Sequence, residues 1–315
     1  MRIVFMGNPG FAVPSLSVLL ASGYDVVAVV SNPDKEQGRG RRPRPTPVAS
    51  FAAHHGLTLI QPAQLDRSSV VARLAQLEPD LFVVVAFRIL PEAWLRVPKL
   101  GSVNLHASLL PKYRGAAPIH WAIMNGDSVT GLTTFILAPT VDTGDMVMRK
   151  RIVVLPDDTF GSLSHRMSRV GAALLRDTVA LLESGKAHPV PQTSTMATKA
   201  PKITSSLLSI AWERHARDVH NRIRALAPSP GAFTMFRNRR LKILKTRLST
   251  SSGNPGEIIS VGKGNVKVAC GWGAVDVLEV QLEGRQRMGA REFLSGTPVS
   301  VGEKFGDAAL SRKGN

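Results

Sequence analysis

Residues 3–6 (Ile-Val-Phe-Met) and 26–30 (Val-Val-Ala-Val-Val) are short apolar runs, and a helical pattern at Ala12–Ala21 separates them. The alternation continues with apolar runs at 57–60, 81–86 and 103–105 and with helical patterns at 48–55 and 68–77. Strands that alternate with helices are typical of a parallel sheet covered on both faces. The first part of the chain is therefore predicted to have an α/β fold with a Rossmann-like, mostly parallel sheet.

The first turn, Gly7-Asn8-Pro9-Gly10, follows a predicted strand and opens a predicted helix, as a nucleotide-binding turn would. It does not have the spacing G-x-G-x-x-G, and no acidic residue ends the second strand. The sequence therefore argues against an NAD site, and the small residues are interpreted as allowing a tight turn.

The second part of the chain has a different pattern. Residues 159–184 form a predicted long helix with Thr159 as N-cap and Gly185 as stop, and residues 186–206, rich in Pro, Ser, Thr and Lys, are predicted to be a linker. A helix over 211–226, five short strands (232–236, 241–248, 257–261, 266–269 and 275–280) and a closing helix over 288–294 predict a smaller OB-like β-barrel. The expected domains are 1–185 and 207–307, followed by a frayed tail at 308–315.

Charge and cysteine content limit the class of protein. The 315 residues carry 40 Lys and Arg against 23 Asp and Glu, a formal net charge of +17. Residues 201–315 hold 19 of the basic and 9 of the acidic residues, so the shorter part is more than twice as basic per residue. Such a balance suggests a polyanionic partner, or a proteome that is basic throughout.

A single cysteine, Cys270, excludes an intrachain disulfide and a metal site built from several thiolates. No apolar run approaches the roughly 20 residues of a membrane span, and the N-terminus has no signal-peptide pattern. We therefore expect a cytoplasmic protein that is not embedded in a membrane.

Residues 31–47 contain four prolines and two glycines, which predicts an irregular loop. Long loops of this kind are usually functional or disordered. Guanidinium groups bind phosphates in bidentate fashion, so nucleic-acid contact is favoured over an idle solvated loop. The cationic side chains of the loop are those of Lys35, Arg39, Arg41, Arg42 and Arg44.

Asn104 and His106 lie two residues apart at the end of the predicted strand at 103–105, so both side chains share one face. The carboxyl ends of parallel strands are where open α/β sheets bind ligands. An amide N–H₂ can stabilise an oxyanion, an imidazole can shuttle a proton, and the carboxylate of Asp142 can orient the imidazole. The alternatives are a structural histidine and, for Asp142 in Val141-Asp-Thr-Gly-Asp145, an ordinary turn residue.

These motifs, together with Ser108-Leu-Leu-Pro-Lys-Tyr-Arg-Gly-Ala-Ala-Pro118-Ile119, closely resemble those of the formyltransferases that use 10-formyltetrahydrofolate. The resemblance runs from residue 1 to about residue 297 and includes His220-Asn-Arg-Ile-Arg-Ala-Leu and Pro230-Gly231 in the second domain. Its motifs are long and specific.

The resemblance implies specific roles. Asn104, His106 and Asp142 would be the catalytic residues, and 10-formyltetrahydrofolate would be the co-substrate, without a metal, NAD or ATP. The acceptor would be the α-amine of initiator methionyl-tRNA, with the arginine-rich loop at the acceptor stem and the C-terminal domain on the tRNA backbone. A complete site in one chain would suit a monomer. The expected folate contacts are Ser108, Leu109, Leu110 and Pro111.

Two alternatives remain from the sequence. One is a formyltransferase with a small amine acceptor, such as an amino-sugar nucleotide or glycinamide ribonucleotide, and the other is a non-catalytic nucleic-acid-binding protein. The chain also departs from the family's usual pattern at Asn8-Pro9-Gly10, at Ala86-Phe-Arg-Ile-Leu-Pro91 and at Ser205-Ser-Leu-Leu-Ser209. The first two departures leave the local ligand contacts open.

Overall fold

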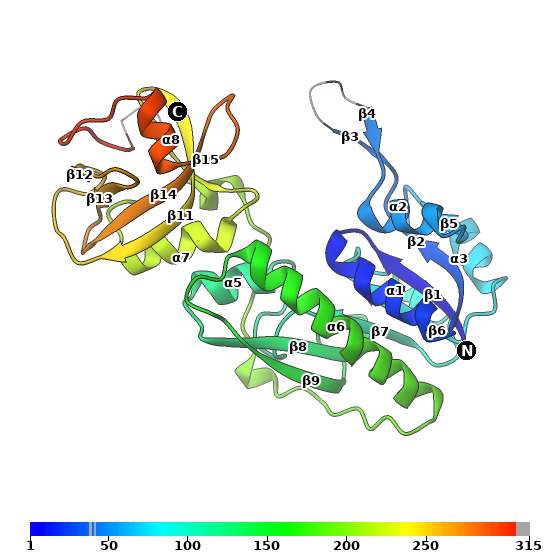
Figure 1. The fold of residues 1–315 in the computed structure, drawn as a ribbon. Helices are drawn as coiled ribbons and strands as arrows, with labels where there is room; N and C mark the ends of the chain where they lie inside the picture. The colour runs from blue at the N-terminus through cyan, green and yellow to red at the C-terminus, as the bar shows by residue number, and fades with distance from the viewer. Residues whose placement is uncertain (38–39, 41, 307–315) are drawn as a thin grey trace, which may run out of the picture. The chain divides into compact units, whose positions relative to one another are not determined.

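The computed structural model describes residues 1–37, 40 and 42–306 (Figure 1). The chain divides into two compact units that interleave along the sequence. Unit 1 consists of Met1–Pro118, Val129–Val153 and Ser164–Pro201, and unit 2 of Ile119–Ser128, Val154–Leu163 and the chain from Lys202 onward. Residues 186–201, interpreted from the sequence as linker, are part of unit 1.

Unit 1 is built on a seven-stranded sheet with the strand order β5-β2-β1-β6-β7-β8-β9. The first five strands of this order pair in parallel, whereas β8 and β9 pair antiparallel. The predicted Rossmann-like, mostly parallel sheet is thus confirmed. The strands are β1 (Arg2–Gly7), β2 (Asp25–Val30), β5 (Leu59–Ile60), β6 (Leu81–Val85), β7 (Ser102–His106), β8 (Val129–Ile136) and β9 (Met146–Val153).

The start of α2 follows from local sequence. Thr46 caps the helix by accepting a hydrogen bond from the Ala49 amide at 3.1 Å, and Pro47 occupies the first helical position. The helices of unit 1 are η1 (Gly10–Ala12), α1 (Val13–Ala21), α2 (Pro47–His54), α3 (Ser68–Ala75), α4 (Glu92–Leu95), η2 (Ser194–Met196) and, from Ser164 onward, α6 (Phe160–Glu183), whose first four residues belong to unit 2.

The packing of β7 determines which of its side chains can serve a site. Gly171 of α6 lies against Leu105, since a Cβ added at Gly171 would be 2.8 Å from Leu105 Cδ2. Leu105 therefore faces α6. Because side chains alternate along a strand, Asn104 and His106 face the opposite side of the sheet.

The prediction of an irregular loop over residues 31–47 is wrong in part. Residues Lys35–Gln37 form β3 and Arg42–Arg44 form β4, an antiparallel hairpin that is separate from the large sheet (Figure 1). Pro43 is tolerated because both strands of a two-stranded hairpin are edges, where a missing N–H does not interrupt a ladder on the outer side. Arg39 and Arg41 lie outside the described residues.

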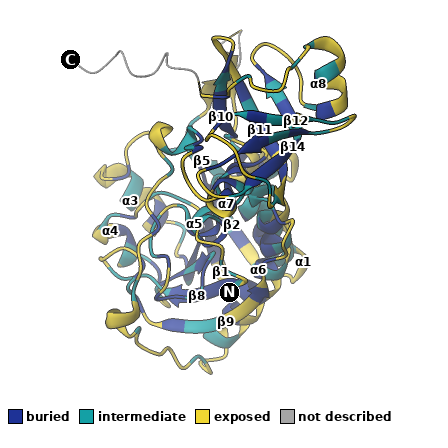
Figure 2. Ribbon diagram, turned by 90° about the vertical axis from the view of Figure 1, so that its left-hand side faces the viewer, coloured by how far each residue is buried: buried dark blue, intermediate teal, exposed yellow. Residues whose placement is uncertain are grey.

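Unit 2 contains an antiparallel sheet with the order β10-β11-β14-β13-β12, and β15 pairs with β14. Its core is apolar and includes Trp212, Val219, Ile223, Phe236 and Phe293. Figure 2 shows buried residues concentrated on the strands. The predicted small β-rich second domain is confirmed. Its strands are β10 (Ala232–Phe236), β11 (Arg239–Ser249), β12 (Ile258–Val261), β13 (Val266–Ala269), β14 (Ala274–Leu282) and β15 (Met288–Gly289).

The helices that contribute to unit 2 are α5 (Pro118–Met124), η3 (Ser205–Leu208), α7 (Ala216–Leu226) and α8 (Ala290–Gly296). The helix α7 begins five residues later than predicted. The reason is tertiary pairing, because His215 forms a β-bridge with Trp272, and the Ala216 amide donates to the Trp272 carbonyl at 2.8 Å. The closing helix also begins later than residue 288, since Met288 and Gly289 form β15.

The stability of unit 2 should depend on pH through His120 of α5. Its ring packs edge-on against Phe160, and its Nδ1 is buried without a hydrogen-bond partner among the described residues. Burial lowers the pKa of His120 from 6.5 to about 4. The unfolded chain thus binds a proton between these values that the folded chain does not, so stability is full above pH 6.5 and falls as the pH drops through this window.

We therefore expect the wild type to lose up to about 2 kcal/mol of unfolding free energy at this site between pH 7 and pH 5. The variant His120→Gln should lack this loss, whereas His54→Gln, at an exposed position, should keep it. Urea unfolding of the three proteins at both pH values measures the difference. Equal pH slopes for wild type and His120→Gln would contradict the assignment.

Candidate active site

Asn104 and His106 lie on β7 as the sequence predicts, and Asp142 comes next to His106 from the turn between β8 and β9. The Nδ1 atom of His106 is 3.8 Å from Oδ2 of Asp142, a distance for an ion pair rather than a hydrogen bond. Both side chains are buried, with residue exposures of 7% and 9%. Burial weakens the solvent screening between the two side chains.

The other ring nitrogen fixes the state of the imidazole. His106 Nε2 lies 2.9 Å from the carbonyl oxygen of Tyr113. A carbonyl can only accept, so Nε2 carries a proton, and in the neutral ring Nδ1, the atom nearer Asp142, holds the lone pair. A proton taken up at Nδ1 would therefore lie between the ring and the carboxylate, as a proton relay requires.

The backbone holds Asp142 in place. Its φ angle is +54°, in the left-handed region that aspartate tolerates better than most residues. Its Oδ2 atom accepts a hydrogen bond from the Gly115 amide at 2.7 Å. Gly115 itself has φ +126° and lies close to the Ala200 carbonyl, so a side chain there would not fit. The turn chemistry that made Asp142 ambiguous in the sequence thus aims its carboxylate at His106.

Gln192 ties this turn to the loop that follows β7. Its Nε2 donates to the carbonyl oxygens of Asp142 at 2.9 Å and Gly144 at 2.8 Å. Its Oε1 accepts from Arg114, whose Nη2 is 2.7 Å away. Thr198 adds a further tie, because its hydroxyl accepts from the Tyr113 amide at 2.8 Å. Sequence reasoning missed both residues, since a segment rich in Pro, Ser, Thr and Lys gives no signal for such distant contacts.

Asn104 presents its amide differently. The residue is partly exposed, and no residue within 1–37, 40 and 42–306 forms a hydrogen bond with its side chain. The N–H₂ group is therefore available to a ligand on the same sheet face as His106. An amide donor next to a proton-carrying imidazole can stabilise an oxyanion that forms between them.

The four residues expected to contact folate form the loop after β7, and their side chains mostly support it. Ser108 and Leu110 are buried, at 0% and 1% exposure, and the Ser108 hydroxyl donates to the Lys112 carbonyl at 2.5 Å. Thr133 of β8 donates to the Ser108 carbonyl and accepts from the Leu110 amide. Pro111 is buried as well, and Leu109 is partly exposed. The role of Ser108, Leu109, Leu110 and Pro111 in ligand contact stays a prediction.

Three of the five predicted cationic residues are described, and all three are on the β3–β4 hairpin. Lys35, Arg42 and Arg44 are exposed. None of the three forms an ion pair with a described residue, so their charges remain available to a polyanion. Arg39 and Arg41 belong to the same stretch of sequence but lie outside the described residues.

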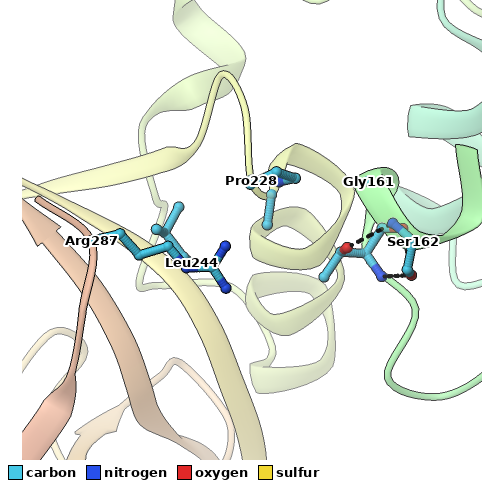
Figure 3. A pocket seen from close by; sticks show the side chains of 7 residues that line it. Gly161, Ser162, Pro228, Leu244 and Arg287 are labelled. Atoms are coloured by element: carbon cyan, nitrogen blue, oxygen red, sulfur yellow. Dashed lines mark hydrogen bonds between the residues drawn. The ribbon is translucent and has the colours of Figure 1, made fainter. Parts of the chain in front are cut away.

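Unit 2 contains a cavity that none of these residues lines (Figure 3). Its volume is about 190 Å³, and its polar groups already have partners. Ser162 donates to Asp158 and exchanges hydrogen bonds with Thr159, and Arg287 pairs with Glu279. We assign no ligand to it. The lining residues are Thr159, Gly161, Ser162, Ala227, Pro228, Leu244 and Arg287.

No helix in the described part of the chain is long and apolar enough to cross a membrane. Within the same residues, no three His, Cys, Asp or Glu side chains lie together as they would around a metal ion.

A Rossmann-like sheet with an amide and an imidazole on one strand, and a carboxylate beside the imidazole, has the side chains that acyl or formyl transfer uses. Comparison with known families agrees. Residues 1–179 match the model of the formyl transferase family, and residues 202–298 match the model of the formyl transferase C-terminal domain. The chain belongs to the formyl transferase family.

Several relatives share almost the whole length of the chain. A protein of Pelotomaculum thermopropionicum named methionyl-tRNA formyltransferase is 43% identical over 98% of this chain and 99% of its own length. A protein of Citrifermentans bemidjiense with the same name is 42% identical over 97% of this chain and 96% of its own.

Solved structures share the fold at lower identity. The sugar 3N-formyl transferase WlaRD, determined with dTDP and 5-N-formyl-THF, has a TM-score of 0.66 and 18% identity, covering 91% of this chain and 99% of its own. HypX from Aquifex aeolicus, determined with tetrahydrofolic acid, has a TM-score of 0.66 and 19% identity, covering 96% of this chain and 48% of its own. At these identities the likeness supports the fold alone.

Proposed function

We propose that this protein transfers the formyl group of 10-formyltetrahydrofolate to the α-amino group of methionyl-initiator tRNA, the reaction that prepares this tRNA for translation initiation. The observation that carries the proposal is the identity of 42–43% with methionyl-tRNA formyltransferases over nearly the full length of both chains. The geometry of Asn104, His106 and Asp142 and the exposed cations of the hairpin suit such a reaction.

In the proposed reaction, the amine nitrogen attacks the formyl carbon and the carbonyl electron pair moves onto oxygen. Asn104 donates to this oxyanion, because its amide is available on the site face of β7. The bond from the formyl carbon to N10 of the folate then breaks, the amide product forms, and N10 gains a proton. The net result moves one proton from the amine to N10, so no redox partner is needed.

His106 and Asp142 provide the path for that proton. His106 Nδ1 takes up a proton, and the carboxylate of Asp142, 3.8 Å away, offsets the positive charge that this proton places on the buried ring. The Tyr113 carbonyl keeps Nε2 protonated and orients the ring. Proton transfer of this kind contributes about 10²–10⁴-fold to a rate. No metal, NAD or ATP takes part in the proposed reaction.

Ser108–Pro111 lies against the folate, the hairpin cations contact the tRNA acceptor stem, and the basic C-terminal part of the chain contacts the tRNA backbone. We place the reaction in the cytoplasm and propose a monomer, because the residues of the trio come from unit 1 of one chain.

A small amine is the competing acceptor, since sugar N-formyltransferases share the fold. The exposed cations Lys35, Arg42 and Arg44 favour the tRNA, because a small acceptor does not require a projecting basic hairpin. A non-catalytic nucleic-acid-binding role is the weaker alternative, because it would not require the trio.

The decisive experiment is formylation of methionyl-tRNA by the purified full chain with 10-formyltetrahydrofolate. The expected product is formylmethionyl-tRNA, and the parallel reactions use an amino-sugar nucleotide and glycinamide ribonucleotide. Turnover of a small amine alone would replace the proposed acceptor. If 10-formyltetrahydrofolate is not turned over with any of the three acceptors, the proposal is refuted.

A further inference from the structure

The basic hairpin β3–β4 has little to hold it in position by itself. It contains three cross-strand pairs, and an isolated two-stranded hairpin is marginally stable in water. Lys35 lies directly opposite Arg44, and like charges in that relation destabilise a hairpin. Its direction relative to the rest of unit 1 must therefore come from contacts at its base.

Asn8 supplies two of those contacts. Its Oδ1 atom accepts hydrogen bonds from the Asn32 amide at 2.8 Å and from the Ser31 hydroxyl at 3.2 Å. The Ser31 hydroxyl also pairs with the Thr46 hydroxyl at 2.5 Å, which joins the two ends of the segment that contains the hairpin. The Asn8 carbonyl in addition accepts from the Val48 amide at 3.3 Å.

Gln61 holds the same base through a second set of hydrogen bonds. Its Nε2 donates to the Asn32 carbonyl at 2.9 Å and to Asp34 Oδ1 at 2.8 Å. Asp34 immediately precedes β3. The chain that enters the hairpin is thus held by hydrogen bonds at Ser31, Asn32 and Asp34, and the chain that leaves it is held through Thr46.

Asn8 also connects the hairpin to the edge of the sheet that carries the catalytic residues. It directly follows β1, and β1, β6 and β7 are parallel neighbours. Their carboxyl ends therefore lie at one edge of the sheet, where β7 ends with His106. A shift of the Asn8 contacts would move the hairpin cations relative to this edge.

We propose that Asn8 is a positioning residue for the RNA substrate, acting with Gln61 as a clamp on the base of the basic hairpin. The clamp orders the hairpin before the RNA arrives, so that binding does not have to order it. This inference rests on the proposed function, because it takes the tRNA as the ligand of the hairpin. Asn8 does not touch the reacting atoms in this scheme.

The test compares Asn8→Leu, which removes the acceptor, with Asn8→Asp, which keeps an acceptor for both hydrogen bonds. Loss of two hydrogen bonds should raise KM for methionyl-tRNA about tenfold in Asn8→Leu, with KM for 10-formyltetrahydrofolate within about twofold of wild type. Asn8→Asp should restore most of the tRNA KM. An equal rise in both KM values, or no rescue by aspartate, would overturn the clamp.

A double-mutant cycle separates positioning from a general loss of stability. In a background with Arg42 and Arg44 replaced by glutamine, Asn8→Leu should have little further effect on the tRNA KM, because the cations that it positions are gone. If the effects of Asn8→Leu and of the arginine replacements on the tRNA KM multiply, Asn8 acts independently of the hairpin. The clamp and the proposed function can fail separately. If the wild-type protein formylates methionyl-tRNA but the variants do not show these KM effects, the clamp is refuted and the proposed function stands.

Gln61→Leu is a second test variant, to be used if Asn8→Leu does not fold. It should raise the tRNA KM in the same selective way. Gln64→Leu is the matched control, because Gln64 is an exposed glutamine three residues further on that accepts a hydrogen bond from Arg67. Equal tRNA KM values for Gln61→Leu, Gln64→Leu and wild type would contradict the proposal.

Discussion

Replacing His106 with alanine should lower kcat for formyl transfer by about 10²–10⁴-fold, the range typical of lost general acid–base catalysis. The reason is that the variant removes the imidazole that the structure brings beside the Asp142 carboxylate. The KM for tRNA should change little, because the predicted RNA contacts lie on the hairpin. Single-turnover kinetics with saturating 10-formyltetrahydrofolate separate the chemical step from binding.

Asn104→Leu should cost about 10²–10³-fold in kcat, as does the loss of one oxyanion donor elsewhere. Asp142→Asn keeps the shape of the side chain and an oxygen that can accept from the Gly115 amide, but removes the charge beside His106. It should therefore lower kcat while the protein keeps its stability. Residues that act as one catalytic unit give non-additive losses, so combined variants of the three should lose much less than the product of the single losses.

His54→Ala provides the control, because His54 is an exposed histidine of the same unit that is distant in sequence from the trio. It should show wild-type kcat. If both Asn104→Leu and His106→Ala turn over at near-wild-type rates, the assignment of the catalytic residues is wrong.

The sequence predicts the parts of the site that depend on local pattern. Spacing along β7 places Asn104 and His106 on one face, and the structure has them there with Leu105 against α6. The residues alone leave Asp142 open between a partner of His106 and an ordinary turn residue, and family resemblance favours the partner. The left-handed backbone of Asp142 and a hydrogen bond from the Gly115 amide fix the contact, and Gly115 lies 27 residues earlier in the sequence.

The remaining differences have the same physical origin. Gln192 and Thr198 lie in a segment without periodicity, and only tertiary hydrogen bonds give them a role. The start of α7 depends on pairing with Trp272 rather than on helix propensity. The β3–β4 hairpin escapes prediction because proline and glycine normally break a strand, whereas an edge position tolerates Pro43.

Neutralising the hairpin should weaken tRNA binding far more than it affects the chemistry. The triple variant in which Lys35, Arg42 and Arg44 become glutamine should raise KM for methionyl-tRNA by about tenfold or more, and it should lower kcat to the extent that the hairpin positions the acceptor end. The slope of log Kd against log salt concentration should decrease by about 0.7–0.9 for each phosphate that the variant no longer neutralises. The KM for 10-formyltetrahydrofolate should stay unchanged.

A control of equal charge shows whether position or net charge is responsible. The edge strand β9 carries three consecutive exposed cations, and their replacement by glutamine removes an equal number of charges from another part of unit 1. If the tRNA is held by the hairpin, this control should shift the tRNA KM much less than the hairpin variant does. Equal shifts would show a general electrostatic effect. Unchanged kinetics after replacement of all four arginines of the 31–47 segment would refute the role of the hairpin. The three control residues are Arg149, Lys150 and Arg151, and the four arginines are Arg39, Arg41, Arg42 and Arg44.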